Sequence, residues 1–181
     1  MKASTGSKDS REEARTLLLE MGIHRSPVPV ADIAKKLGIA LRFTPLDAGL
    51  SGMIFRKGVA CIVVNSLHHP NRQRFTLGHE IAHFLLHMQD IGGEVHVDKK
   101  FLAFARDMKS SEGWDRKEIE ANRFAAELLV PRDFLARELR GQVVDLEDDA
   151  SVSDLADNFQ VSRQVMTFRL AEFSQGRPNG R

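Results

Sequence analysis

Several features that define common protein classes are scarce or missing in this chain. The 181 residues include one cysteine, Cys61, which excludes an intramolecular disulfide framework. No apolar run approaches the roughly 20 residues that a membrane helix needs. Residues 1–11 are polar and show no signal-peptide pattern. There is no tyrosine, so no phenol hydroxyl is available for chemistry. We therefore expect a cytoplasmic protein with no membrane association.

An excess of charge of one sign is also missing. The 26 Lys and Arg residues almost balance the 25 Asp and Glu residues, which leaves a net charge of +1. Such a balance does not favour general binding to nucleic acids or to membrane surfaces. Apolar residues make up 42% of the chain, enough for a hydrophobic core, and the length fits one domain with a small appendage.

The chain mixes helical and strand-like patterns, which predicts an α+β fold with a small antiparallel sheet. A turn at Arg56–Gly58 is expected to join the last two of the first three strands as a hairpin. Pro131 is expected to end or redirect one helix. The expected helices are 11–21, 30–37, 71–88, 116–130 and two within 151–173, and the expected strands are 39–43, 52–55, 59–65 and 101–106.

The most informative segment is His79-Glu80-Ile81-Ala82-His83. On a helix, positions i and i+4 lie on one face, so His79 and His83 can present two imidazoles to one metal ion. Glu80 is then placed to act on water, as in the H-E-x-x-H motif of zinc peptidases. The surrounding residues are apolar, and buried imidazoles cost several kcal/mol unless they are paired or bind metal. The alternative, two hydrogen-bonded core histidines, leaves Glu80 without a role.

A catalytic zinc site usually has three protein ligands and one open position. The spacing that supplies a third histidine downstream of the motif is absent, because Leu86 and Gln89 occupy the diagnostic positions. His87 continues the same helix face, but we expect it to pack or to form hydrogen bonds rather than to bind metal. The third ligand is therefore expected to be a carboxylate from the helix that begins near residue 116. Its candidates are Glu118, Glu120 and Glu127.

Spaced blocks of the sequence resemble the ImmA/IrrE family of metallo-endopeptidases. The blocks are 74–83, Leu86-His87 and 120–131, supported by 27–30, 33–39, Ser51-Gly52 and 63–65. The resemblance spans about residues 14–171 and implies a zincin-like, gluzincin-type core. It implies one Zn²⁺ per chain, with Mn²⁺ as an alternative. The implied ligands are His79, His83 and Glu120, with Glu80 as the catalytic base.

Two departures from related zinc peptidases affect this prediction. Thermolysin-like enzymes often carry an Asp four residues after the ligand Glu, and Phe124 occupies that place relative to Glu120. The group that orients a ligand histidine is therefore unidentified at this point. Because there is no tyrosine, the oxyanion would need another donor, for which His87, His96 and Arg106 are candidates.

The resemblance also implies a substrate class. Members of the family typically cleave a helix-turn-helix repressor encoded nearby, which relieves repression in mobile elements or stress responses, and others accompany toxin–antitoxin-like regulators. A co-encoded repressor is thus the expected substrate. The strand at 59–65 is expected to offer an open edge to which an extended substrate adds as a further strand.

The competing hypothesis is a DNA-binding regulator with a degenerate peptidase core. Residues 152–171 read like a helix-turn-helix in which Ser162 caps the second helix. Acidic residues before and on the first helix oppose phosphate binding, which favours packing or protein docking instead. The expected organisation is a disordered N-terminus (1–10), a peptidase core (11–145), a helix-turn-helix-like segment (146–173) and a flexible tail (174–181), with a lid within 89–114.

Overall fold

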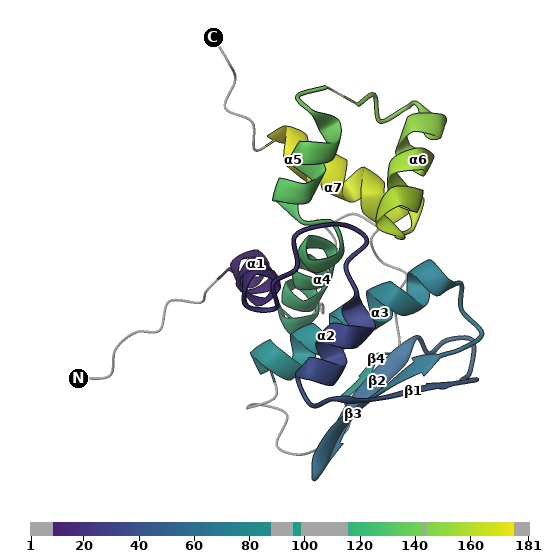
Figure 1. Cartoon of the computed structure of the whole chain (residues 1–181). Coiled ribbons are helices and arrows are strands. Elements are labelled where there is room, and N and C mark those ends of the chain that lie inside the picture. Colours follow the sequence, from purple (N-terminus) through teal and green to yellow (C-terminus); the bar gives the residue numbers. More distant parts are fainter. Residues whose placement is uncertain (1–8, 88–95, 99–115, 143, 176–181) are drawn as a thin grey trace.

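In the computed structural model, which describes residues 9–87, 96–98, 116–142 and 144–175, helices pack on one face of a small sheet (Figure 1). The expected strand at 101–106, the side chains of His96 and Arg106, the remainder of the expected lid and most of the two expected terminal tails lie outside the described residues. The helices are α1 (Ser10–Glu20), α2 (Val30–Lys36), α3 (Pro70–Ala82), the π-helical turn η1 (His83–His87), α4 (Arg116–Leu129), α5 (Arg132–Leu139), α6 (Asp149–Phe159) and α7 (Arg163–Gln175).

The helices expected from the sequence agree closely with those observed, and one helix was not expected. As expected, the helix before Pro131 ends there, with α4 closing at Leu129, and α5 begins directly after the proline. Pro131 lies at the N-cap of α5 with an extended backbone, a position that needs no donor from its nitrogen. The proline thus separates two consecutive helices.

The sheet contains β1 (Ala40–Thr44), β2 (Gly52–Lys57), β3 (Val59–Asn65) and β4 (His96–Asp98) in the order β1-β3-β2-β4. The hairpin between β2 and β3 is confirmed, with Lys57 opposite Val59. β1 runs parallel to β3, so the sheet is mixed, and the expected antiparallel sheet is wrong in this respect. β3 lies between β1 and β2. It therefore has no open edge, and the prediction that a substrate adds there is wrong.

Helix α3 lies between the sheet and α4, and both faces of this helix are buried. It contacts β2 and β3 on one side and α4 on the other. Its apolar residues Phe75, Leu77 and Ile81 belong to the same core as Ile54 and Ile62 of the strands. Burying a side chain of this size contributes roughly 1.5–3 kcal/mol. The helix that carries the H-E-x-x-H motif is therefore held rigidly.

A buried asparagine, Asn65 at the end of β3, holds the connection between β1 and β2. Its side-chain NH2 donates to the carbonyl oxygens of Leu46, Asp47 and Leu50, and its oxygen accepts from the backbone N–H groups of Leu46 and Leu67. Buried polar groups are stable only when paired in this way. Asn65 thus fixes the chain that leads into Gly52 on β2.

A second buried polar group, Glu127 on α4, joins four helices. Its carboxylate accepts from Arg15 Nε of α1 at 2.8 Å, from the backbone N–H of Arg132 of α5 at 3.0 Å and from Arg169 of α7. Arg169 also donates from Nε to the carbonyl oxygen of Val130 at 3.0 Å. Glu127 was an alternative metal ligand in the sequence, and the structure instead places it in this ion-pair network.

Unfolding of the chain is expected to become easier in acid because of Glu127. Burial raises the pKa of Glu127, but the charge of Arg169 and the hydrogen bond from Arg15 more than offset this, so the pKa lies below its ordinary value of 4.5. The stabilisation is fully present above the pKa of the unfolded chain and is lost as pH falls through the lower, folded value. Urea unfolding between pH 7 and pH 3 measures this loss.

The Glu127→Gln variant provides the comparison for this pH prediction. We expect its free energy of unfolding to be lower at pH 7 and to depend less on pH below about 4.5. The exposed Glu147→Gln variant serves as a matched control and should follow the wild-type curve. Identical pH slopes for wild type and Glu127→Gln would contradict the role of Glu127.

Candidate metal centre

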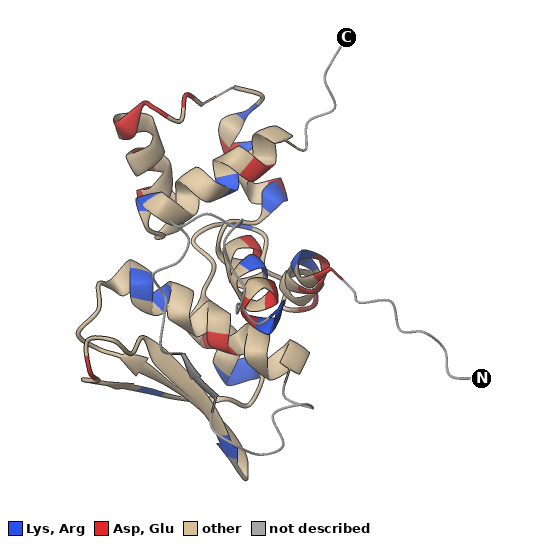
Figure 2. Cartoon of the chain, turned by 180° about the vertical axis from the view of Figure 1, so that it is seen from behind, with Lys and Arg blue, Asp and Glu red and all other residues tan. Residues whose placement is uncertain are grey.

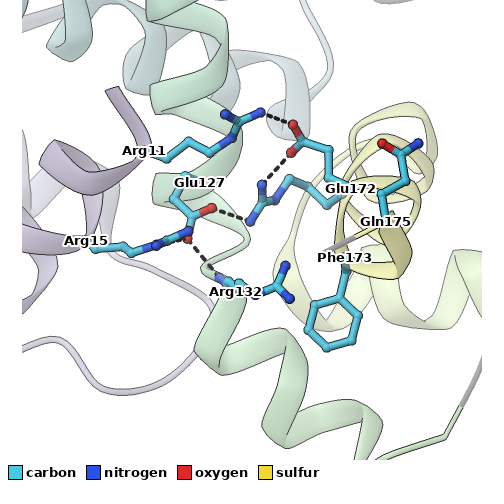
Figure 3. Close-up of a pocket in the computed structure, with 8 residues that line it drawn as sticks. Arg11, Arg15, Glu127, Arg132, Glu172, Phe173 and Gln175 are labelled. Carbon is cyan, nitrogen blue, oxygen red and sulfur yellow. Dashed lines mark hydrogen bonds and ion pairs between the residues drawn. The ribbon is translucent and has the colours of Figure 1, made fainter. Parts of the chain in front are cut away.

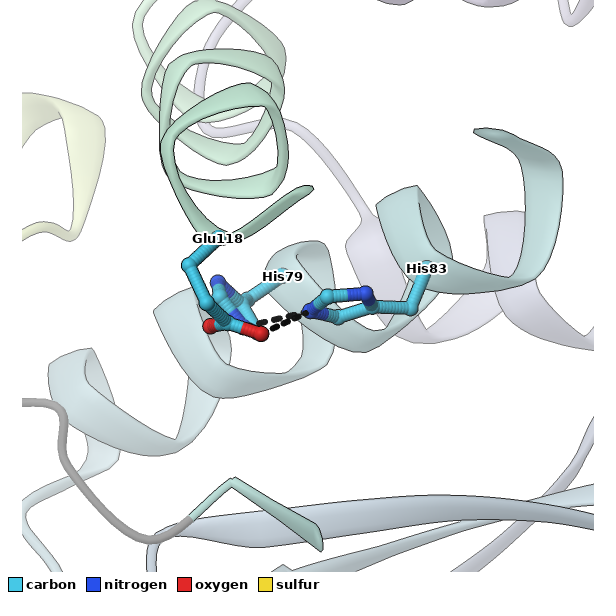
Figure 4. A group of neighbouring side chains, drawn as sticks. All are labelled: His79, His83 and Glu118. Carbon is cyan, nitrogen blue, oxygen red and sulfur yellow. Dashed lines mark hydrogen bonds and ion pairs between the residues drawn. The ribbon is translucent and has the colours of Figure 1, made fainter. Parts of the chain in front are cut away.

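The two histidines of the H-E-x-x-H motif face one another across one helical turn. His79 lies on α3 and His83 begins the π-helical turn η1, and their exposed fractions are 1% and 0%. Their Nε2 atoms are 2.9 Å apart (Figure 4). π-helical turns inside helices occur frequently at functional sites. The pair of imidazoles predicted from the sequence is thus present as a geometric unit.

A third donor reaches this pair from α4, and it is Glu118. Its Oε2 lies 3.2 Å from His79 Nε2 and its Oε1 lies 3.3 Å from His83 Nε2 (Figure 4). A tetrahedral zinc ion with bonds of about 2.0–2.1 Å holds its ligand atoms about 3.3 Å apart. The two Nε2 atoms lie 2.9 Å apart, and each lies 3.2 or 3.3 Å from one oxygen of the Glu118 carboxylate, so the three side chains could hold a single small cation.

The carboxylate implied by the family resemblance, Glu120, lies elsewhere. It contacts His87 and Arg116 rather than the two imidazoles. An α-helix turns by about 100° per residue, so side chains two residues apart project about 200° from each other. Glu118 and Glu120 therefore contact different histidines, and it is Glu118, not Glu120, that the structure brings to the imidazoles of His79 and His83.

His79 has an orienting partner that the sequence did not reveal. Its Nδ1 is 3.0 Å from the side-chain oxygen of Asn122 on α4. With Nδ1–H donated to this oxygen, Nε2 presents its lone pair toward Glu118 and His83. Histidine ligands of metals are commonly held in this way. The sequence signal that could have identified Asn122 is its spacing from Glu118, because residues four apart share one face of a helix.

His83 is held by a longer chain of hydrogen bonds. Its Nδ1 lies 3.1 Å from Nδ1 of His87, whose Nε2 lies 3.2 Å from Glu120 Oε2. Arg116 Nε donates to the other oxygen of Glu120 at 2.8 Å. Burial raises the pKa of Glu120, but the hydrogen bonds from His87 and Arg116 lower this pKa by more. The pKa of Glu120 therefore lies below its ordinary value of 4.5. The ionised carboxylate favours a proton on His87 Nε2, which leaves His87 Nδ1 to accept from His83.

Glu80 is completely buried beside His79, and a glycine makes room for it. Gly52 of β2 runs directly against α3, where a Cβ atom would lie 2.5 Å from Thr76 Cγ2 and 3.6 Å from Glu80 Oε1. Any side chain at this position would displace α3 or the strand. The absence of a side chain at Gly52 therefore lets the sheet approach the Glu80 carboxylate.

A close approach of α3 to α4 brings the three donors together. A Cβ atom at Gly78 would lie 3.5 Å from the Cβ of Ala125, so the two helices already touch at small residues. Ala125 at this contact and Ala121, four residues earlier on α4, are both fully buried. Small residues shorten the distance between helix axes, and Glu118 can then reach His79 and His83.

This arrangement can be compared with known protein families. The family model of the IrrE N-terminal-like domain, Peptidase_M78, matches residues 34–171, which include His79, His83 and Glu118. The chain belongs to this family. The match confirms the resemblance noted in the sequence and places the chain among metallopeptidases. Among curated protein sequences, none matches the chain significantly.

Within this Peptidase_M78 member, His79, His83 and Glu118 form a group that could hold a metal ion. Two of the donors are imidazoles and one is a carboxylate, a set that suits zinc. None of the helices that the structure describes is both long enough and apolar enough to cross a membrane.

The chain of hydrogen bonds through His87 is expected to strengthen metal binding. In a Glu120→Leu variant, His87 loses its acceptor and His83 loses its fixed orientation, so zinc affinity should fall roughly 10- to 100-fold. The Glu120→Gln variant retains an oxygen acceptor and should restore most of the affinity. Competition with a chromophoric chelator measures the affinity without activity. Equal affinities for Glu120→Leu and wild type would contradict this role.

Proposed function

We propose that this chain is a zinc-dependent endopeptidase whose metal is held by His79, His83 and Glu118. The observation that carries the proposal is the convergence of the Glu118 carboxylate and two imidazoles, with interatomic distances of 2.9 to 3.3 Å, on a buried H-E-x-x-H helix. The Glu118 side chain is 26% exposed, so solvent reaches the carboxylate that contacts the two buried imidazoles. Membership of Peptidase_M78 supports the same reaction class.

In this proposal the chain's own residues divide the chemistry between them. Bound zinc would supply Lewis-acid polarisation of the scissile carbonyl and of a water molecule. Glu80 accepts a proton from the attacking water and delivers it to the leaving amine. Asn122 holds the ring of His79, and His87 with Glu120 holds the ring of His83. Fixed ligand rings keep the site ordered before a substrate binds.

The proposed substrate is a helix-turn-helix repressor, supported by the family resemblance. An extended segment of such a protein can bind by adding a strand to an open sheet edge. Among the described strands, β1 and β4 are the outer ones, and β4 pairs with β2, whose Gly52 lies against Glu80. We propose the outer edge of β4 as the place where the substrate strand adds.

The competing regulator hypothesis receives little support from α7, the helix that would read DNA. Its two arginines are already engaged, because Arg169 is buried against Glu127 and Arg163 pairs with Asp149. Ser162 caps this helix as expected, accepting from the backbone N–H of Val165 at 3.2 Å.

The turn between α6 and α7 and the start of α6 also argue against binding to phosphates. The turn is bonded to α3, since Asn71 donates to the carbonyl oxygen of Val161 at 2.9 Å and Arg74 to that of Gln160 at 3.1 Å. Acidic residues gather at the start of α6 (Figure 2). Phosphate binding needs positive charge, so packing or protein docking suits this segment better.

Cleavage of the co-encoded repressor by the purified protein tests the proposal. We expect zinc-loaded protein to cleave it, a chelator to stop the reaction, added zinc to restore it and His83→Ala to be inactive. A parallel gel-shift assay with duplex DNA at near-physiological salt tests the alternative. Cleavage that persists after complete metal removal would refute the proposed mechanism, and a chelator-insensitive DNA shift without cleavage would favour the regulator.

A further inference from the structure

A polar pocket lies on the side of α4 that carries Glu127. It encloses about 360 Å³ and is formed by α1, α4, α5 and α7 (Figure 3). Cavities of a few hundred Å³ are typical of small-molecule sites. The lining residues are Arg11, Arg15, Glu127, Arg132, Arg169, Glu172, Phe173 and Gln175. Five of these, Arg11, Arg15, Glu172, Phe173 and Gln175, fall outside the segment matched by the family model, so the pocket is not explained by the peptidase site.

The charges that line this pocket do not balance. Four guanidinium groups face two carboxylates, which leaves two positive charges within the lining. Asp9, which is exposed and lies 3.8 Å from Arg11 Nη1, does not line the pocket. Like charges held together in a partly enclosed space repel one another, and a doubly charged anion would relieve this repulsion.

The arginines also keep hydrogen-bond donors available. Arg169 donates from all three nitrogens, to Glu127, Glu172 and the carbonyl oxygen of Val130, and forms a rigid wall. Arg15 uses only Nε, toward Glu127, and its side chain is 44% exposed. Among the residues that the structure describes, the two Nη groups of Arg15 have no hydrogen-bond partner. A guanidinium fork of this kind matches the oxygens of a phosphate group.

We propose that this pocket binds a phosphate dianion, either the free ion or the terminal group of a small phosphorylated molecule. The Nη groups of Arg15 bind the phosphate oxygens, Arg11, which is paired with Glu172, adds positive charge beside them, and the Arg169 network fixes the opposite wall. The occupant would connect α1 to α7 across α4, and we expect it to raise the melting temperature of the protein.

Titration of the full-length protein with inorganic phosphate, pyrophosphate and AMP at constant ionic strength tests this proposal. We expect saturable heat in calorimetry and a higher melting temperature. Arg15→Gln should bind roughly tenfold more weakly or worse, because charge-assisted hydrogen bonds are lost. Tighter binding of AMP than of inorganic phosphate would assign the site to an organic phosphate, and the reverse order to the free ion.

A pair of variants at Gln175 keeps the test independent of folding, because this residue is exposed at the end of α7. Gln175→Glu should weaken phosphate binding and Gln175→Lys should strengthen it, each by roughly fivefold, from charge alone. Arg163→Gln, which removes an arginine of α7 outside the pocket, should bind like wild type. The proposal is overturned by an absence of saturable binding of all three probes, by equal affinities of the two Gln175 variants, or by equal weakening in Arg163→Gln.

Discussion

A Glu118→Gln variant is expected to lose nearly all affinity for zinc. The change removes the negative charge and leaves a neutral amide oxygen where a carboxylate faces two imidazoles at 3.2 and 3.3 Å. The loss should exceed the roughly 100-fold that removal of an outer hydrogen-bond partner costs, because a ligand itself is replaced. Zinc affinity measured against a chromophoric chelator, together with metal content after dialysis, gives the result.

Glu120→Gln is the matched control, because it makes the same chemical change two residues further along the same helix. This variant keeps an acceptor for His87 and should stay within about tenfold of wild-type affinity. The two variants therefore separate the ligand seen in the structure from the ligand implied by the family resemblance. Loss of zinc by Glu120→Gln with retention by Glu118→Gln would reverse the assignment.

A Glu80→Gln variant is expected to keep zinc and lose cleavage. The amide occupies nearly the same volume beside Gly52 but cannot accept a proton from water. General-base catalysis typically contributes 10²–10⁴-fold to the rate, so the turnover number should fall by about that factor. Single-turnover cleavage of the proposed repressor substrate, with zinc content determined in parallel, measures both quantities.

Gly52→Ala provides a comparison for Glu80 that leaves the carboxylate in place. The added methyl group would clash with Thr76 Cγ2 and shift α3, so stability and activity should fall together. Glu80→Gln, in contrast, should unfold at about the same temperature as wild type. Wild-type cleavage rates in Glu80→Gln would remove Glu80 from the mechanism.

The local parts of the site could be predicted from the sequence. His79, Glu80 and His83 lie within five residues of one helix, where backbone geometry alone places i and i+4 on one face. The predicted extents of β3 and α4 are close to those observed, because β3 is an apolar run and the apolar residues of α4 recur on one helix face. α5 was not expected, since its eight residues, Arg132–Leu139, are few and follow directly after a proline.

The non-local parts of the site could not be predicted in this way. The choice between Glu118 and Glu120 depends on how α4 is rotated about its axis, and the contact of Ala125 with Gly78 sets that rotation. The neighbours of β3 were also assigned incorrectly, because parallel pairing with β1 joins segments that a hairpin pattern does not connect.

The sequence by itself therefore determined the helix that carries the H-E-x-x-H motif, its two imidazoles and the family of the protein, because those features depend on spacing along one helix and on matched residue types. The tertiary structure decided the third donor, the partners Asn122 and His87 that orient the rings, and the burial of Glu127 among arginines of other helices. Each of these depends on the rotation and separation of packed helices, which are set by side-chain contacts between distant segments.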